Sequence, residues 1–164
     1  MPATTKTWVR TALAATLLSS TALMPAWSAE VTQERLENPE PENWLMVHRD
    51  YSSTRFSPLD QINAENAGDL KVAFITAIGG LPGGGRWDSG GHQATPLVND
   101  GEMYIVDGWG VVYKLDVSSG DRGLISWVMD PGVDKADVWI PSNRGVALYK
   151  DMVISVTGDG QVIW

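Results

Sequence analysis

Cysteine is absent from this chain of 164 residues, and its absence excludes disulfide bonds, thiolate metal sites and catalysis by a cysteine nucleophile. Basic residues are few, because 12 Lys and Arg stand against 20 Asp and Glu, for a formal charge of −8. Such an acidic chain is not expected to bind nucleic acid or an anionic membrane surface nonspecifically. No apolar run is long enough to predict a transmembrane segment.

The N-terminus has the pattern of a secretory signal peptide. Lys6 and Arg10 precede an apolar run at 11–24, which leads into the small residues of "PAWSA". We assign residues 1–29 to the signal peptide, with cleavage near Ser28 or Ala29, and expect the mature protein to be periplasmic. Its removal takes away two basic and no acidic residues, so the formal charge becomes −10.

Two kinds of sequence follow the signal peptide. Residues 30–43, "EVTQERLENPEPEN", alternate Pro with acids and show almost no apolar periodicity, which predicts an extended arm. Residues 44–164 contain short apolar runs such as "MYIVDG", "VVYKLDV" and "DMVISVTG", separated by Gly, Asp, Asn and Ser. This pattern is typical of an all-β domain.

An internal repeat organises this region. The stretch "VNDGEMYIVDGWGVVYKLD" can be laid on "LYKDMVISVTGDGQVIW" at a shift of 50 residues without a gap, and both carry a strand, a Gly-x-Gly turn and a second strand. We expect residues 108–110 and 158–160 to supply the positive φ of tight hairpins, with Asp159-Gly160 as a type I′ pair.

Two aromatic residues extend the repeat. Phe74 ends "NAGDLKVAF" and Trp127 ends "SSGDRGLISW", 53 residues later, so each is predicted to close an outer strand. A period near fifty with four short strands is typical of a β-propeller blade. We place one blade at about 96–127 and a second from about Val146, so the chain is expected to be a fragment with only about the first two blades, cut within the second.

Several stretches carry a family resemblance: "NWLMVHRDYSSTRFSPLDQINAENAGDLKVAF", "GGHQATPLVNDGEMYIVDGWGVVYKLD" and "SNRGVALYKDMVIS". Together they resemble the N-terminal part of the pyrroloquinoline quinone (PQQ) dependent alcohol dehydrogenases, the quinoproteins related to methanol dehydrogenase. The resemblance covers essentially all of residues 43–164. It implies an eight-bladed propeller and a periplasmic enzyme that oxidises an alcohol, or a sugar or polyol, and passes electrons to a cytochrome c or a quinone.

The resemblance also implies the cofactors and two contact residues. The family holds PQQ with Ca²⁺ or a lanthanide, and its metal ligands and catalytic Asp are expected beyond Trp164, so this fragment alone is expected to be inactive. Arg144 of "NRG" matches the arginine that reaches the quinone, and a guanidinium suits the carboxylates and quinone oxygens of PQQ. Gln93 of "HQATP" stands where the family usually has Glu at the cofactor rim. The alternatives are an Arg144 paired with a nearby Asp and a Gln93 that only satisfies backbone groups.

A departure from the family lies upstream of Arg144. Val138 and Trp139 stand where the alcohol dehydrogenases carry two adjacent cysteines joined against one face of the PQQ ring. Trp139 is hypothesised to supply the same wall by stacking, and an ordinary packing role is the alternative. His48 and His92 are interpreted as structural or surface residues.

A different class of function is a non-catalytic exported β-propeller that acts as a scaffold or binding module. Such scaffolds are typically lipoproteins, and this chain has no cysteine to lipidate. They would also have no need for "HQATP" and "NRG" in the positions of the quinoproteins. The dehydrogenase is therefore the favoured interpretation.

Overall fold

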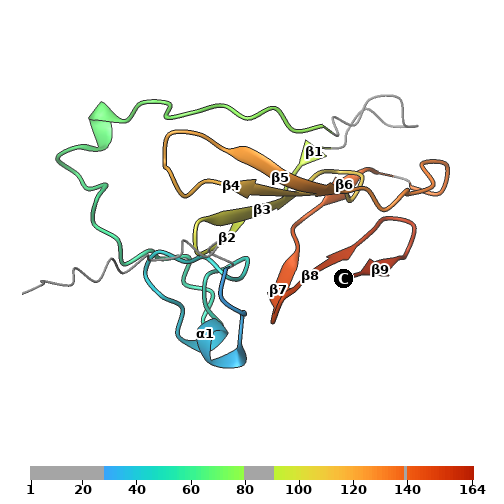
Figure 1. Ribbon diagram of the computed structural model, residues 1–164, viewed down its shortest axis with the longest axis horizontal. Helices are drawn as coiled ribbons and strands as arrows, with labels where there is room; N and C mark the ends of the chain where they lie inside the picture. Colours follow the sequence, from blue (N-terminus) through green and yellow to red (C-terminus); the bar gives the residue numbers. More distant parts are fainter. Residues whose placement is uncertain (1–27, 80–90, 139) are drawn as a thin grey trace, which may run out of the picture.

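The computed structural model describes residues 28–79, 91–138 and 140–164, and short β-strands make up most of its regular structure (Figure 1). In chain order its elements are α1 (Gln33–Glu37), the 3-10 helix η1 (Ala67–Asp69), β1 (Gly91–His92), β2 (Leu97–Asn99), β3 (Glu102–Val106), β4 (Val112–Asp116), β5 (Leu124–Met129), β6 (Ser142–Asn143), β7 (Ala147–Tyr149), β8 (Met152–Val156) and β9 (Val162–Ile163). The all-β class predicted from the sequence is confirmed. Within these ranges, no helix combines the length and the apolar character needed to cross a bilayer.

The strands form two antiparallel sheets and one parallel pair. The first sheet has the order β2-β3-β4-β5, the second has the order β7-β8-β9, and β1 pairs with β6. Apolar side chains of the two antiparallel sheets share one core, which includes Val106 and Val112 of the first sheet and Leu148 of the second. Each buried side chain of this kind contributes about 1.5–3 kcal/mol, so packing between the sheets is the main source of stability.

The two sheets repeat one another, as the sequence predicts. Strands β7, β8 and β9 begin 50 residues after β2, β3 and β4. The left-handed turn residues recur as well: Asp100 and Lys150 have φ of 50° and 55°, and Gly110 and Gly160 have φ of 88° and 89°. The repeat therefore extends from strands to individual backbone angles.

The predicted type I′ turn at Asp159-Gly160 is wrong. That turn needs a positive φ at both residues, and only Gly160 has one. Instead, the nitrogen of Gly160 donates to the carbonyl of Thr157 at 3.1 Å, and the nitrogen of Thr157 donates to the carbonyl of Gln161 at 3.0 Å. The central residues of this turn are Gly158 and Asp159, and neither has a positive φ. It is therefore a type I turn that ends in a left-handed glycine, Gly160.

The segment 30–43 is not the extended arm that its composition indicates. It contains α1, whose first turn is capped by Thr32, because the side chain of Thr32 accepts a hydrogen bond from the nitrogen of Arg35 at 3.3 Å. Val31 and Leu36 are buried in the shared core. Burial of these two apolar residues helps to hold the segment against the sheets, although most of the rest of it is polar.

The outer strand predicted to end at Phe74 is also not formed. Residues 66–74, all of them described, contain η1 and irregular backbone but no strand. They lead into a segment that runs beside the start of β5 (Figure 1), where the hydroxyl of Thr76 donates to the carbonyl of Gly123 at 2.9 Å. A strand needs a partner in a hydrogen-bonded ladder, and the described residues provide none at this position.

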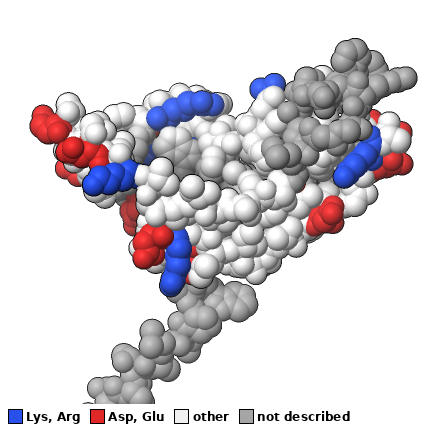
Figure 2. All heavy atoms as spheres, turned by 90° about the horizontal axis from the view of Figure 1, so that it is seen from above, with Lys and Arg blue, Asp and Glu red and all other residues white. Residues whose placement is uncertain are grey.

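The face of the molecule that lies uppermost in Figure 1 carries few charged side chains near its centre. Figure 2 shows Lys, Arg, Asp and Glu mainly around the rim of the face, with uncharged surface between them. Strand β5 contributes exposed apolar side chains, among them Leu124 at 51% and Val128 at 50% of their full accessible area. Exposed apolar surface of this kind is typical of faces that contact other protein structure.

Candidate functional site

The parallel pair β1–β6 brings the two predicted contact residues together. Gly91 lies opposite Ser142 and His92 lies opposite Asn143. Gln93 and Arg144 are the next residues of the two strands, so they leave the pair side by side. The nitrogen of Thr95 donates to the carbonyl of Arg144 at 3.4 Å, which continues the contact beyond the strands.

Asn143 fixes the backbone on which Arg144 is carried. Its Oδ1 accepts a hydrogen bond from the nitrogen of Gly145 at 3.0 Å, which is an Asx-type turn around Arg144. Its Nδ2 donates to the carbonyl of Val156, the last residue of β8, at 2.8 Å. Gly145 has a φ of 144°, which side chains disfavour, so a glycine completes the turn. The position of Arg144 is thus tied to both β1 and the second sheet.

The side chains of Arg144 and Gln93 are both exposed. Within the described part of the chain, the Arg144 guanidinium makes neither an ion pair nor a hydrogen bond, whereas the ion pairs there involve Arg35 and Lys114. The alternative of an Arg144 paired with a nearby Asp therefore has no support among these residues. A guanidinium and an amide are left facing solvent from a constrained backbone.

The hairpin between β3 and β4 supports this strand pair from below. A Cβ placed on Gly108 would lie 2.6 Å from the carbonyl oxygen of Pro141 and 3.6 Å from that of Gly91. Gly108 is therefore needed for close approach to the residues that precede β6 and begin β1, and not for a positive φ. Sequence reasoning assigned the right residue to the hairpin and missed why it is glycine.

A buried carboxylate holds this hairpin in shape. Asp107 is fully buried, and its Oδ1 accepts from the nitrogens of Trp109 at 2.9 Å and Val111 at 3.0 Å. The hydroxyl of Tyr113 donates to its Oδ2 at 3.2 Å. Burial, followed by the nearby charge of Asp107, raises the pKa of Tyr113, so this hydroxyl stays a neutral donor. The site therefore stands on a hydrogen-bonded turn.

Trp139, the third predicted contact residue, lies outside the described residues, so its stacking role stays a prediction. Its neighbour Val138 is described. The Cγ1 of Val138 lies 3.0 Å from the place where a Cβ of Gly158 would be. Val138 therefore packs against the second Gly-x-Gly hairpin, just as Pro141 packs against the first.

The two histidines have modest roles in the described structure. His48 accepts a hydrogen bond at Nδ1 from Nε of Arg55 at 2.8 Å. His92 is exposed in β1. Neither residue lies in a cluster with other metal-ligating groups, since the described residues contain no group of three or more His, Asp or Glu close enough to hold an ion.

Two hollows lie between the sheets and apart from Arg144. The larger, of about 480 Å³, is lined by both sheets and the N-terminal arm, including Tyr104, Trp127 and Leu148. Neither Gln93 nor Arg144 lines it or the smaller hollow of about 330 Å³. Because a PQQ site needs cationic and amide donors, we place the candidate site at the ends of β1 and β6.

Sequence reasoning did not single out Asn143, and it assigned Gly108 to the hairpin without linking it to the site. The triplet Asn143-Arg144-Gly145 carries the signal for the first, because Asn followed two residues later by Gly favours an Asx turn. No local signal identifies the contact between Gly108 and Pro141. That contact joins residues 33 positions apart through the fold alone.

Comparisons with known proteins agree on one family. The model described as "Glucose/ethanol/alcohol dehydrogenase, beta-propeller domain", of the PQQ type, matches residues 44–163. Quinohemoprotein alcohol dehydrogenase of Comamonas testosteroni is 37% identical over 125 residues, which cover 74% of this chain and 16% of that protein. The dehydrogenase subunit of the quinone alcohol dehydrogenase of Acetobacter aceti is 38% identical over 127 residues, which cover 75% of this chain and 16% of the relative.

A solved structure shows the same fold. A europium-containing methanol dehydrogenase superposes with a TM-score of 0.56 and 25% sequence identity, over 80% of this chain and 24% of that one. The chain spans 16% of the length of the two curated alcohol dehydrogenases.

Proposed function

The chain belongs to the PQQ β-propeller family of glucose, ethanol and alcohol dehydrogenases, and we propose on this premise that it supplies part of the PQQ-binding face of an exported quinoprotein that oxidises an alcohol. The observation that carries the proposal is the parallel pairing of β1 with β6, which sets Gln93 and Arg144 side by side. Both side chains are exposed on a backbone held by Asn143.

The donors at this place fit the cofactor. PQQ is a polyanion with three carboxylates and adjacent quinone oxygens, and when bound it supplies a two-electron acceptor for the alcohol. Arg144 would offer a planar fork of N–H donors to a carboxylate or a quinone oxygen. Gln93 would offer one amide donor pair and one acceptor oxygen without adding negative charge. Both groups would bind and orient the cofactor.

Trp139 would form a flat apolar wall beside these donors, as the resemblance of the sequence before Arg144 to the family indicates. The metal, Ca²⁺ or a lanthanide, would be held by residues outside the described part of the chain. An alcohol is the substrate, as the names of the relatives indicate. A cytochrome c or a quinone takes the electrons. The N-terminal signal peptide directs export to the periplasm, with cleavage after Ser28 or Ala29.

The test uses the full-length quinoprotein that carries this chain. Replacing Arg144 by Ala removes a charge-assisted contact of about 1.5–3 kcal/mol, so we expect PQQ affinity to fall about 10- to 100-fold. Arg144→Lys keeps the charge and loses the fork, and we expect an intermediate loss. PQQ affinity is measured by titration of the apoprotein, with the thermal midpoint of the apoprotein as a check on folding.

Arg122 provides the matched control. It is also an exposed arginine, and it lies in the turn before β5. Arg122→Ala removes the same charge without touching the proposed site and should leave PQQ affinity unchanged. Equal effects of Arg144→Ala and Arg122→Ala would show that only the net charge matters and would overturn the assignment of Arg144.

A further inference from the structure

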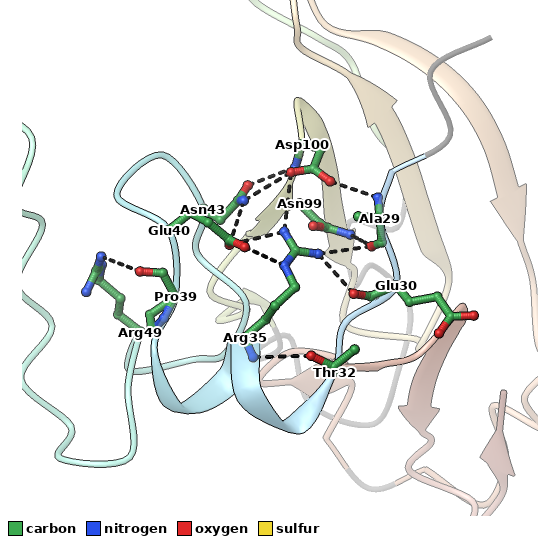
Figure 3. A network of polar contacts seen from close by, with 10 residues as sticks. All are labelled: Ala29, Glu30, Thr32, Arg35, Pro39, Glu40, Asn43, Arg49, Asn99 and Asp100. Atoms are coloured by element: carbon green, nitrogen blue, oxygen red, sulfur yellow. Dashed lines mark hydrogen bonds and ion pairs between the residues drawn. The ribbon is translucent and has the colours of Figure 1, made fainter. Parts of the chain in front are cut away.

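Ala29, near the N-terminal end of the described chain, is held on both sides by hydrogen bonds (Figure 3). Its backbone nitrogen donates to Oδ2 of Asp100 at 2.8 Å. Its carbonyl oxygen accepts from Nδ2 of Asn99 at 2.8 Å and from Nη1 of Arg35 at 3.1 Å. Both backbone polar groups of Ala29 are therefore bound by the folded chain.

The cluster around Ala29 contains one cation for two carboxylates. Arg35 binds Glu40 through Nε at 2.6 Å and Nη2 at 3.1 Å, and the same side chain lies 3.3 Å from Oδ1 of Asp100. The hydrogen bond from Arg35 is the largest cause that lowers the pKa of Glu40 to about 2, so this carboxyl is ionised at neutral pH. Arg35 makes two hydrogen bonds to Glu40 and only one longer contact with Asp100, so the charge of Asp100 is only partly balanced.

Neutral donors complete part of the shell around Asp100. Nδ2 of Asn43 donates to Oδ1 of Asp100 at 3.1 Å, and Oδ1 of Asn43 accepts from the backbone nitrogen of Asp100 at 2.8 Å. These contacts orient the carboxylate so that Oδ2 faces the nitrogen of Ala29. Arg35 balances only one of the two carboxylates, so one negative charge remains unbalanced near Oδ2 of Asp100, where the nitrogen of Ala29 lies.

The sequence before Ala29 indicates that this nitrogen becomes a chain end. Signal peptidases prefer small residues at the first and third positions before the cleaved bond. Ala26 and Ser28 satisfy this pattern for cleavage after Ser28. Cleavage one residue later would place the bulky Trp27 at the outer position and would discard the anchored Ala29.

We infer that removal of the signal peptide after Ser28 creates an α-ammonium group on Ala29 that forms an ion pair with Asp100 and locks the N-terminal arm onto the propeller. The inference rests on the export step of the proposed function. Hydrolysis of the Ser28–Ala29 peptide bond consumes one water, leaves a carboxylate on Ser28 and frees the amine of Ala29, which takes up a proton. The neutral amide donor to Oδ2 thereby becomes a cation in the same place.

The lock would join the two repeats at equivalent turns. Ala29 binds Asp100 in the turn between β2 and β3, and two residues later Val31 exchanges backbone hydrogen bonds with Lys150 at 2.9 and 2.7 Å. Asp100 and Lys150 occupy the same place in the 50-residue repeat, and both have a positive φ. A charge-assisted bond at Ala29 therefore fastens the arm across both blades, close to its free end.

The first measurement is the N-terminal residue of the exported full-length protein, determined by mass spectrometry of its N-terminal peptide. We expect Ala29. Next, the α-amine is labelled with ¹³C-methyl groups by reductive methylation, and its NMR signal is followed with pH. Pairing with Asp100 should raise its pKa above the ordinary range of about 7.7–8.0. Besides Asp100, Arg35 and Glu40, the charged groups around Ala29 are those that line the shared hollow with it, namely Glu30, Glu102, Lys114, Lys150 and Asp151.

Asp100→Asn tests the partner, and Asp151→Asn is its matched control. Asp151 lies in the equivalent turn of the second blade and lines the same hollow, but its carboxylate makes no hydrogen bond to the described residues. We expect Asp100→Asn to return the α-amine pKa to the ordinary range and Asp151→Asn to change it little. The pair stabilises the fold below the unfolded pKa of the amine, and this contribution is lost as the pH rises through the higher folded value.

A glycine inserted between Ser28 and Ala29 covers the case in which Asp100→Asn fails to fold. The insertion keeps the N–H of Ala29 on Asp100 and moves the ammonium group one residue away. It should therefore lower the pKa of the α-amine relative to wild type, and it should lower the thermal midpoint measured at pH values below about 8. An N-terminus other than Ala29 overturns the inference at the processing step. An Ala29 amine with an ordinary pKa in the wild-type protein overturns the ion pair while leaving export intact. PQQ binding enters neither readout.

Discussion

At the scale of single residues, the candidate site separates the group that binds from the group that positions it. Arg144 is exposed and would touch the cofactor, whereas both polar atoms of the Asn143 side chain bind backbone groups. A long side chain loses much rotamer freedom on binding, so a fixed backbone limits the further cost of placing the guanidinium. Asn143 is thus a positioning residue for Arg144.

We predict that Asn143→Ala lowers PQQ affinity of the full-length protein by severalfold, because it frees the turn around Arg144 from Gly145 and Val156. Asn143→Asp keeps the acceptor for Gly145 and loses the donor to Val156, so it should lie between Asn143→Ala and wild type. Each lost hydrogen bond also costs about 0.5–1.5 kcal/mol of stability. PQQ titration and denaturant unfolding measure the two effects separately.

Asn66 provides a matched comparison. It also donates to one backbone carbonyl, that of Gln61 at 2.8 Å, and accepts from one backbone nitrogen, that of Asn63 at 2.9 Å. Asn66→Ala should therefore cost similar stability with no change in PQQ affinity. If both alanine variants lost PQQ affinity in proportion to stability, Asn143 would have only a structural role.

Which residues can be found from the sequence depends on the range of their contacts. Gln93 and Arg144 were identified through motifs, and the structure brings them together because their strands pair. Asn143 was open to identification through its local Asx pattern. The packing of Gly108 on Pro141 could not be read from the chain, because it depends on where a separate strand pair crosses the hairpin.

At the scale of elements, the two Gly-x-Gly hairpins share one backbone form and carry different loads. Gly108 faces the carbonyl oxygen of Pro141 at 2.6 Å, measured from a Cβ placed on it, and backbone cannot move aside easily. Gly158 faces the side chain of Val138 at 3.0 Å, and a side chain can shift by a few tenths of an ångström. Neither glycine has a positive φ. The difference between them is therefore steric and not conformational.

We predict that Gly108→Ala is the more damaging of the two substitutions. It should displace the segment before β6, lower the thermal midpoint by several degrees and weaken PQQ binding through Arg144. Overpacking of this kind typically costs about 1–3 kcal/mol. Gly158→Ala, at the equivalent position of the repeat, should cost less and leave PQQ affinity near wild type. Equal losses in both variants would contradict the support role of Gly108.

The elements that the sequence predicted well are those that local chemistry determines. The hairpins follow from alternating apolar residues around Gly turns, and their repeat follows from a shift of 50 residues. The type I′ turn failed because an Asp-Gly pair also suits the type I turn with a left-handed glycine. The prediction of an extended arm was wrong because Val31 and Leu36 are buried against sheets that are distant in the sequence. The strand at Phe74 failed because strands need partners.

At the scale of the whole molecule, the described sheets expose apolar surface that a propeller would cover with neighbouring blades. Besides β5, the second sheet exposes Val156 at 56%, Val162 at 59% and Trp164 at 77% of their full areas. The outer strands β5 and β9 also present backbone groups with no neighbouring strand among the described residues. Such edges and faces favour association with other chains.

We therefore predict that residues 29–164 expressed alone associate as concentration rises and do not hold PQQ tightly, because Arg144 and Gln93 would form only part of the proposed cofactor site. Size-exclusion chromatography with light scattering checks the first point, and PQQ titration checks the second. Replacing Val128 and Val162 with Thr, which keeps the β-branched shape, should reduce association without changing the strands. A monomeric segment that binds PQQ saturably at micromolar concentration would show that two sheets suffice for the site.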